Sequence, residues 1–319
     1  MKPYVIGVDL GGTNTVFGIV DSAGNIIEEG SIKTGSFNTA SEFVAAGLDC
    51  IHHIVKKVGG IEQIQGMGIG APNANYYTGT IEFAPNIAWA HDGVVQLAGM
   101  FAGELGIPVR MTNDANAAAM GEKLYGIAKG MKNFIMITLG TGLGAGIIIN
   151  GKLVYGHDGF AGELGHVNMD RSENARPCGC GRKGCLETYC SATGVARTAR
   201  EFLQKTNRPS ILRQKPLDEI ESLDVFLAAQ KGDEIAKEVF QFTGTMLGWA
   251  CADFTAFSSP EAFIFFGGLC KSGDLIMKPI EETYNRVVMP LFRNKAKFLI
   301  SGLMNKNAAV LGASALGWE

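Results

Sequence analysis

Six short motifs hold the residue types that could do chemistry in this chain. Two are glycine-rich turns with a threonine, one sets a carboxylate beside an amide, and one sets a carboxylate near an imidazole. The fifth is a cysteine cluster and the sixth a pair of glycines. In chain order they are Asp9–Thr13 (DLGGT), Asn113–Asn116 (NDAN), Leu139–Gly146 (LGTGLGAG), Gly162–His166 (GELGH), Cys178–Glu187 (CGCGRKGCLE) and Phe266–Gly268 (FGG). Together they indicate phosphoryl transfer to a polyhydroxy substrate.

The two glycine-rich turns suit phosphate groups. Glycine lets several backbone N–H groups converge on an anion without a Cβ in the way, and a threonine adds a hydroxyl donor. Asp9 ends the first strand, where a carboxylate could hold a hydrated Mg²⁺. An ordinary hairpin turn is the alternative for either motif alone. The residues predicted to line the phosphates are Gly11, Gly12 and Thr13 in the first turn and Gly140, Thr141 and Gly142 in the second.

Two other phosphate-binding patterns are absent from the sequence or out of context. The chain has no G-x-x-x-x-G-K-[ST] motif. The segment 66–71 (GMGIGA) resembles a dinucleotide fingerprint, but Pro72 and an asparagine-rich loop follow it instead of a helix.

Asp114 is the candidate general base. It follows an apolar strand, Val109–Thr112, and precedes an alanine-rich helix. A carboxylate there could accept the proton of a hydroxyl whose oxygen attacks a γ-phosphate. Capping the helix is the alternative role for Asp114. The neighbouring Asn113 can offer a donor and an acceptor to sugar hydroxyls.

Glu163 and His166 are three residues apart, so one helical turn would place both on the same side. A carboxylate and an imidazole suit the paired hydroxyls of a hexose. The alternatives are a structural ion pair or a histidine satisfied within the core.

The cysteine cluster predicts a metal site. Cys178, Cys180 and Cys185 supply three thiolates, and His166 lies twelve residues before the first of them. Three Cys and one His make a closed tetrahedral Zn²⁺ site, which leaves no open position for a reactive water. We therefore expect a structural zinc that fixes the loop carrying His166 and Glu187. A Cys₄ site with Cys190 in place of His166, and unligated cysteines, remain open.

The elements that must position these residues alternate between strands and helices. Each glycine turn lies between two apolar runs, and the resulting strand–turn–strand pattern occurs twice, which indicates two related halves of an α/β protein. A cleft between two such lobes would place the turns on facing walls. The segment Lys205–Leu223 is predicted to be a surface excursion or a lid-like loop. The strands expected are Tyr4–Asp9, Thr15–Val20, Ile26–Ser31, Gln65–Ile69, Val109–Thr112, Phe134–Thr138, Ala145–Ile149 and Ala262–Phe266; the helices expected are Ser41–Val58, Ala115–Gly121, Ser191–Gln204, Lys231–Ala256 and Ala308–Leu316.

Bulk composition narrows the class of protein. The 319 residues are 46% hydrophobic and 18% charged with a net charge of −3, which gives no electrostatic reason to expect nucleic acid or an anionic membrane as a partner. Val5–Leu10 is too short for a secretory signal, and Phe240–Phe257 reads as a buried helix rather than a membrane span. Seven cysteines, three of them clustered, fit a reducing cytoplasm with a metal site.

With these residues in place, the chain resembles the ROK family (repressor, ORF, kinase) of bacterial sugar kinases and is most similar to its glucokinase branch. The similarity runs from Asp9 to the C-terminal helix and includes the cysteine signature with its glycines, Cys178–Glu187. It implies an actin-like (ribonuclease H-like) two-lobed ATPase fold with an inserted zinc loop at 166–187. It also implies Mg²⁺-ATP as donor, the 6-hydroxyl of a hexose as acceptor, and a homodimer.

The resemblance also assigns residues and lobes. Asp114 becomes the base, and the small lobe becomes residues 1–114 plus about 303–319, with 115–302 as the large lobe. The sugar ligands implied are Asn86, Asn113, Asp114, Glu163, His166 and Glu187. The nucleotide side is lined by Asp9, Gly11, Gly12, Thr13, Gly140, Thr141, Gly142, Gly267 and Gly268, and the zinc ligands are His166, Cys178, Cys180 and Cys185.

This chain departs from the family pattern at three places. Asn14 replaces a common lysine or arginine, Asn73–Tyr77 replaces a glycine-containing loop, and Leu269 replaces a third glycine.

Glucose is the leading acceptor. N-acetylmannosamine, N-acetylglucosamine, mannose, fructose and allose are alternatives, since epimers differ by contacts to one hydroxyl. Two other classes are a sugar-responsive repressor, whose N-terminal helix-turn-helix would have no room before Asp9, and a non-catalytic actin-like ATPase.

Overall fold

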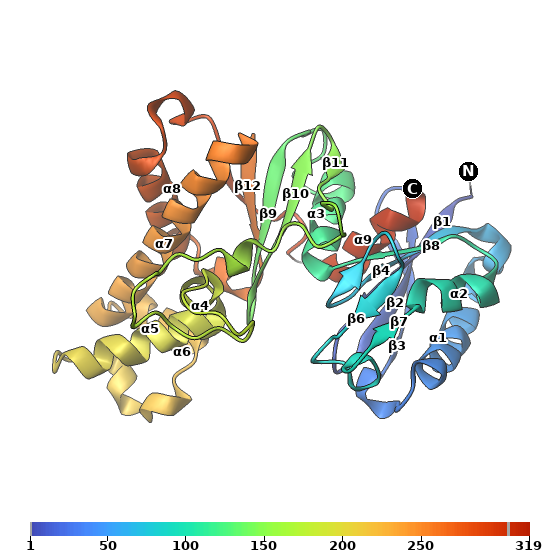
Figure 1. Cartoon of the computed structure of the whole chain (residues 1–319), viewed down its shortest axis with the longest axis horizontal. Helices are drawn as coiled ribbons and strands as arrows, with labels where there is room; N and C mark the ends of the chain where they lie inside the picture. Colours follow the sequence, from blue (N-terminus) through green and yellow to red (C-terminus); the bar gives the residue numbers. More distant parts are fainter. Residues whose placement is uncertain (1, 305–306) are drawn as a thin grey trace. The chain divides into compact units, whose positions relative to one another are not determined.

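The computed structural model describes residues 2–304 and 307–319, and the chain forms two compact units (Figure 1). Unit 1 consists of Met1–Met131, Gly146–Gly162 and Ser301–Glu319. Unit 2 consists of Lys132–Ala145 and Glu163–Ile300. The chain therefore passes between the units several times.

The sheet of unit 1 has the strand order β3-β2-β1-β4-β8. The first three strands form an antiparallel meander, and β4 and β8 run parallel to β1. Because parallel strands end at the same edge, the residues after β1, β4 and β8 meet there. The strands are β1 (Tyr4–Leu10), β2 (Thr15–Asp21), β3 (Ile26–Ile32), β4 (Ile64–Gly70) and β8 (Val109–Thr112).

Helices cover both faces of this sheet. Helices α1 (Ala40–Val55) and α2 (Leu97–Leu105) pack over the apolar face, where Ile6 and Phe17 belong to one buried core with Phe101. Helices α3 (Asp114–Tyr125) and α9 (Ala308–Ser314) lie over the other face (Figure 1).

Glycine lets α9 approach the sheet closely. A Cβ added to Gly68 in β4 would lie 1.9 Å from the backbone oxygen of Ala313, and one added to Gly7 in β1 would lie 2.1 Å from that of Val310. The small residues Gly and Ala therefore serve as the contact surface between sheet and helix. A short three-stranded sheet completes unit 1, with β5 (Ala74–Asn75), β6 (Thr80–Glu82) and β7 (Val94–Val95).

The second five-stranded sheet has the order β11-β10-β9-β12-β13, which repeats the pattern of the first. In both, a meander of three strands is followed by two strands parallel to its first strand. The prediction of two related halves is confirmed at the level of sheet order. The strands are β9 (Phe134–Leu139), β10 (Leu143–Ile149), β11 (Lys152–Leu153), β12 (Ala262–Phe266) and β13 (Lys297–Ile300).

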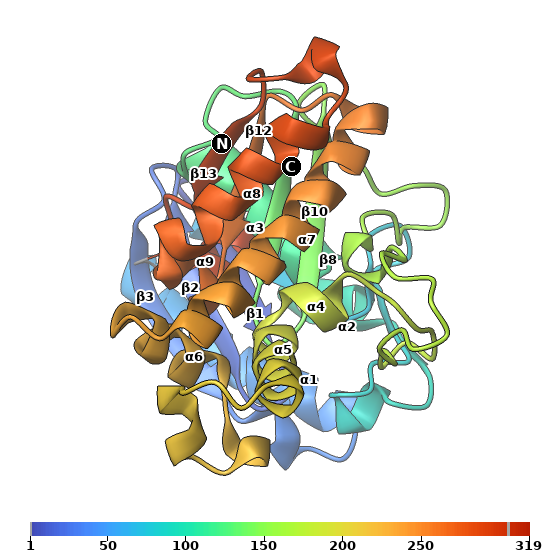
Figure 2. The same cartoon turned by 90° about the vertical axis from the view of Figure 1, so that its left-hand side faces the viewer.

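The helices of unit 2 follow the second glycine turn and the cysteine loop. The longest, α7, lies beside α8 along much of its length (Figure 2). Among the described residues, no helix combines the length and apolarity that crossing a bilayer requires. The helices are α4 (Glu187–Cys190), α5 (Ala192–Lys205), α6 (Ser222–Gln230), α7 (Glu234–Ser258) and α8 (Asp274–Val287).

The structure refines several expected boundaries. The helix expected at 231–256 begins at Glu234, because the side chain of Asp233 accepts the N–H of Ala236 and caps it. The helix expected at 41–58 becomes 3₁₀ from Lys56 to Val58. The excursion 205–223 stays within unit 2, is anchored by the buried Leu212, and ends in α6, which the sequence analysis did not assign.

The lobe boundaries expected from the resemblance remain a prediction about domains. In the compact units, α3 groups with unit 1 because it packs along α9. Residues 305–306, within the expected C-terminal part of the small lobe, lie outside the described residues.

Candidate active site

Asp9 and Asp114 both belong to unit 1 and follow neighbouring parts of one sheet. Asp9 lies in β1, and Asp114 comes two residues after β8. Burial raises the pKa of Asp9 to about 6, and the negative charge of Asp114 adds to the effect. The structure thus brings together the predicted Mg²⁺ carboxylate and the predicted base.

The residue that caps α3 is Asn113 and not Asp114. The Asn113 side-chain oxygen accepts the N–H of Asn116 at 2.7 Å. This leaves the NH₂ group of Asn113 as the part that could donate to a ligand. Asp114 is the first helical residue, and its Oδ1 accepts the N–H of Ala115 at 2.8 Å.

The pKa of the Asp114 carboxyl group is raised above that of a free aspartate. Its side chain is exposed at the surface, yet enough protein atoms surround the carboxyl group to raise its pKa through desolvation. The N–H of Ala115 acts in the opposite direction and does not cancel the effect. A raised pKa makes a carboxylate a stronger base.

The first glycine turn lies against the segment that contains Asn86. The N–H of Gly11 donates to the carbonyl of Asn14 at 3.0 Å and closes the turn. A Cβ on Gly12 would lie 2.5 Å from the backbone oxygen of Asn86, so the two segments touch. Unit 1 therefore gathers the DLGGT turn, Asn86 and Asp114.

The second glycine turn, between β9 and β10, is held from one side by the start of α4 and α5. Glu187 Oε2 accepts the N–H of Leu143 at 2.9 Å, and the N–H of Ala192 donates to the carbonyl of Gly140 at 2.9 Å. Gly267 lies against the same turn, since a Cβ there would be 2.4 Å from the Leu139 oxygen. The predicted nucleotide residues of unit 2 therefore lie together.

A cavity of about 260 Å³ opens beside Gly268. Its walls are largely apolar, with Phe226 from α6 and Phe240 from α7, and Lys271 at its edge. This pocket was not predicted, because part of its wall comes from α6, a helix absent from the sequence-based expectations. The i, i+3, i+4 spacing of Leu223, Phe226 and Leu227 in that segment is the signal that indicates a helix.

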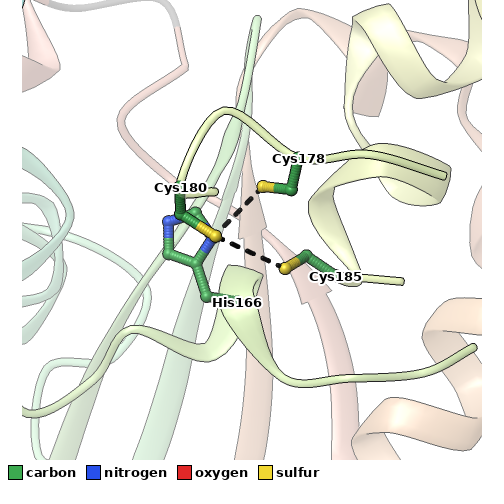
Figure 3. A group of neighbouring side chains, drawn as sticks. All are labelled: His166, Cys178, Cys180 and Cys185. Carbon is green, nitrogen blue, oxygen red and sulfur yellow. Dashed lines mark hydrogen bonds between the residues drawn. The ribbon is translucent and has the colours of Figure 1, made fainter. Parts of the chain in front are cut away.

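The cysteine loop gathers three sulfurs and one imidazole (Figure 3). The ligand atoms of His166, Cys178, Cys180 and Cys185 all lie within 4.8 Å of one another. Cys180 Sγ is 3.7 Å from Cys185 Sγ, and Cys178 Sγ is 3.6 Å from His166 Nδ1. On a tetrahedral zinc with bonds of about 2.3 Å, two sulfurs are about 3.8 Å apart. The donor set and its spacing fit Zn²⁺.

The other ring nitrogen of His166 faces Glu163. His166 ends the short 3₁₀ turn Leu164–His166, and its Nε2 lies 3.9 Å from Glu163 Oε2. The two residues therefore share one side, as predicted. At 3.9 Å the two atoms are too far apart for a hydrogen bond.

Cys190 is not part of the cluster. It is buried in α4, and its thiol donates to the carbonyl of Thr243. The open alternative in which Cys190 replaces His166 is therefore wrong. The loop also depends on Gly184, whose φ is 75° and whose added Cβ would lie 1.8 Å from the oxygen of Asp170.

The predicted sugar ligands are divided between the two units. Asn86, Asn113 and Asp114 lie in unit 1. Glu163, His166 and Glu187 lie in unit 2. Within each unit, the predicted residues neighbour a predicted phosphate turn or the cysteine cluster.

The repeated sheet, with a glycine turn in each copy and a carboxylate pair at one sheet edge, defines an α/β protein of the actin-like class. The sequence profile described as the ROK family matches residues 5–319. The chain belongs to the ROK family.

Several relatives are similar over nearly the whole chain. A glucokinase of Streptomyces coelicolor is 38% identical, covering 98% of this chain and 97% of the relative. A solved ROK glucokinase of Streptomyces griseus, in complex with glucose and AMPPNP, is 35% identical with a TM-score of 0.76, covering 98% of both chains. A xylose repressor of Caldicellulosiruptor bescii is 30% identical, covering 98% of this chain and 77% of the repressor.

Proposed function

We propose that this protein is an ATP-dependent glucokinase that transfers the γ-phosphoryl group to the 6-hydroxyl of glucose. The observation that carries the proposal is the position of Asp114, a carboxyl group of raised pKa beside Asp9 in a chain that resembles glucokinases from end to end. Similarity to a solved complex with glucose and AMPPNP supports both substrates.

The proposed reaction needs one base and well-placed dipoles. The glucose O6 attacks the γ-phosphorus, the bond to the β-phosphate oxygen breaks, and the O6 proton passes to an Asp114 carboxylate oxygen. The products are ADP and glucose 6-phosphate, and Asp114 releases its proton to water. Phosphoryl transfer depends mainly on positioning and charge neutralisation, so no covalent intermediate on the protein is required.

In this proposal, the two glycine turns bind the phosphates of the nucleotide and the apolar cavity binds its base. Backbone N–H groups of 12–13 and 141–142 would hold phosphate oxygens, since those of Gly11 and Gly140 donate within their own turns. The cavity beside Gly268, with Phe226 and Phe240, has the size and apolar walls for a nucleobase. Asp9 would hold a hydrated Mg²⁺, which neutralises charge on the β- and γ-phosphates when bound.

We also propose that His166, Cys178, Cys180 and Cys185 hold a structural Zn²⁺. The tetrahedral spacing of three sulfurs and one nitrogen supports this. Four protein ligands leave no position for a reactive water, so the ion would order the loop and not take part in the reaction.

For the acceptor, the proposed contacts to hydroxyls are Asn86, Asn113 and Asp114 from unit 1 and Glu163, His166 and Glu187 from unit 2. A homodimer, expected from the resemblance, stays a prediction that chromatography with light scattering can test. A cytoplasmic location, expected from the cysteine content, stays a prediction for cell fractionation.

A panel assay tests the proposed function. ADP release would be measured with Mg²⁺-ATP and glucose, mannose, fructose, allose, N-acetylglucosamine or N-acetylmannosamine. We expect the highest kcat/KM with glucose. A higher kcat/KM with another sugar would contradict glucose as acceptor, and ADP release that no sugar stimulates would contradict a sugar kinase.

A further inference from the structure

One carboxylate connects the metal cluster to the second phosphate turn. Glu187 follows Cys185 by two residues and is the first residue of α4. Its Oε1 lies 3.7 Å from Cys178 Sγ, and its Oε2 accepts the N–H of Leu143 in the turn. The Cys178 thiol can donate to Oε1 only in the metal-free protein, because a zinc-bound thiolate carries no proton; the bond from Leu143 to Oε2 does not depend on that proton.

The rest of the turn depends on the same short segment. The N–H of Ala192 donates to the carbonyl of Gly140, and the Thr193 hydroxyl donates to the carbonyl of Thr141, each at 2.9 Å. Residues 187–193 thus make three hydrogen bonds to residues 140–143. The position of α4 and of the start of α5 decides where the turn lies.

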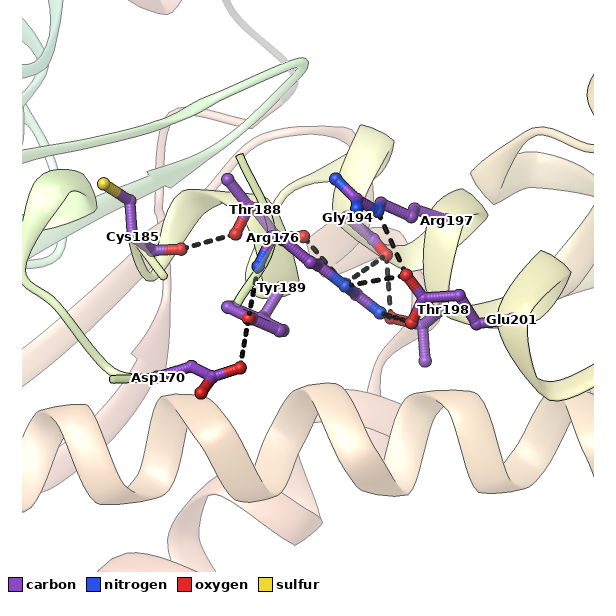
Figure 4. Close-up of polar contacts among 9 residues, drawn as sticks. All are labelled: Asp170, Arg176, Cys185, Thr188, Tyr189, Gly194, Arg197, Thr198 and Glu201. Carbon is purple, nitrogen blue, oxygen red and sulfur yellow. Dashed lines mark hydrogen bonds and ion pairs between the residues drawn. The ribbon is translucent and has the colours of Figure 1, made fainter. Parts of the chain in front are cut away.

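A buried arginine ties the cysteine loop to this support (Figure 4). Arg176 is 4% exposed and donates to the backbone oxygens of Thr188 and Gly194, at 2.7 and 3.4 Å. It also forms an ion pair with Glu201 at 2.6 Å and lies 4.4 Å from the ring centre of Tyr189. Hydrogen bonds and an ion pair therefore join the cysteine loop to helices α4 and α5, which contact the turn.

We propose that Glu187 is a positioning residue that couples the Cys/His cluster to the phosphate turn 140–144. Metal binding fixes the loop up to Cys185, two residues before Glu187, and Glu187 in turn fixes the N–H of Leu143. The turn is then held in place before any nucleotide arrives. This inference deepens the proposed kinase function and rests on it for the role of the turn.

The test uses readouts that a role limited to sugar contact would not change. Backbone amide hydrogen exchange of residues 140–144 would be followed in zinc-loaded protein without substrates, and AMPPNP binding by calorimetry without sugar. For Glu187→Ala we expect exchange to be about tenfold faster and AMPPNP about fivefold weaker, because one charge-assisted hydrogen bond is lost. Glu187→Gln keeps an oxygen acceptor and should stay near wild type. Glu173→Ala, an exposed carboxylate on the same loop, is the matched control.

Two further measurements keep the inference testable. Chelation of zinc from the wild type should also accelerate exchange at 140–144. Gly142→Ala, whose added Cβ would lie 2.3 Å from Glu187 Oε2, should loosen the turn as Glu187→Ala does, and the two changes together should be no worse than either alone.

The outcomes separate the inference from the proposed function. Unchanged exchange and unchanged AMPPNP affinity in Glu187→Ala, with only the KM for sugar raised, would overturn the coupling role. Additive effects of Gly142→Ala and Glu187→Ala on exchange would also overturn it. A wild type that binds no AMPPNP would overturn the proposed function instead, and the exchange data would still decide the coupling.

Discussion

Asp114 lies close enough to Asp9 for its negative charge to add to burial in raising the pKa of Asp9 to about 6. Two carboxylates that must share one sheet edge repel each other, and a cation or a proton relieves the repulsion. This relationship makes the stability of the unliganded protein depend on pH in a defined direction.

Replacing Asp9 tests that direction. The folded-state pKa lies above the usual 3.8, so the unfolded chain ionises first and wild-type stability falls as pH rises from about 4 to about 6. Asp9→Asn avoids this loss. Without Mg²⁺ or nucleotide, we expect Asp9→Asn to be more stable than wild type by about 1 kcal/mol at pH 7, after discounting for partial exposure, and nearly equal at pH 4. Urea unfolding at both pH values measures it, and a difference that does not change with pH would count against the carboxylate pair.

The cysteine cluster makes a prediction about metal content. Wild-type protein should contain about one zinc per chain. Cys180→Ala should lose the zinc and melt at a lower temperature, because the loop loses a ligand. Cys190→Ala, which removes a buried thiol outside the cluster, should keep the zinc. Elemental analysis of the purified proteins distinguishes them; zinc retained in Cys180→Ala and lost in Cys190→Ala would show that the ligand set is wrong.

The close approach of α9 to the sheet predicts a large effect of one methyl group. Gly68→Ala would place a Cβ 1.9 Å from the Ala313 oxygen, so the helix must move, and we expect a loss of about 3 kcal/mol. Gly103→Ala in α2 meets nothing within 4 Å and should raise stability by about 0.5–1 kcal/mol. Chemical unfolding of both variants gives the comparison. Equal stability of the two would mean that α9 does not rest on β4.

Much of the fold could be predicted because its strands are short apolar runs that end at glycine or asparagine turns. Val109–Thr112 and Ala262–Phe266 have the boundaries expected. The repeat of the sheet also followed from the two glycine turns. Helices α6 and α8 were not recognised, since α6 follows a proline-containing excursion and α8 contains Pro279. Proline in or just before these segments predicts a break in the helix, whereas packing against the rest of unit 2 keeps the residues helical.

The candidate site was predictable where chemistry dictates residue type. Three cysteines and a histidine at metal-ligand spacing come together in the structure, and Asp9 and Asp114 do as well. The exact partners were not predictable. Which asparagine or aspartate caps α3, and which nitrogen of His166 faces the sulfurs, depend on backbone direction that spacing alone does not give.

The general-base role of Asp114 is the central claim, and Asp114→Asn tests it most directly. Asparagine keeps the size of the side chain and an oxygen that can accept the N–H of Ala115, so glucose binding should stay within a few-fold of wild type. Without a carboxylate to accept the O6 proton, kcat for glucose phosphorylation should fall by about 10³-fold. A kcat within tenfold of wild type, with glucose 6-phosphate as product, would contradict the account.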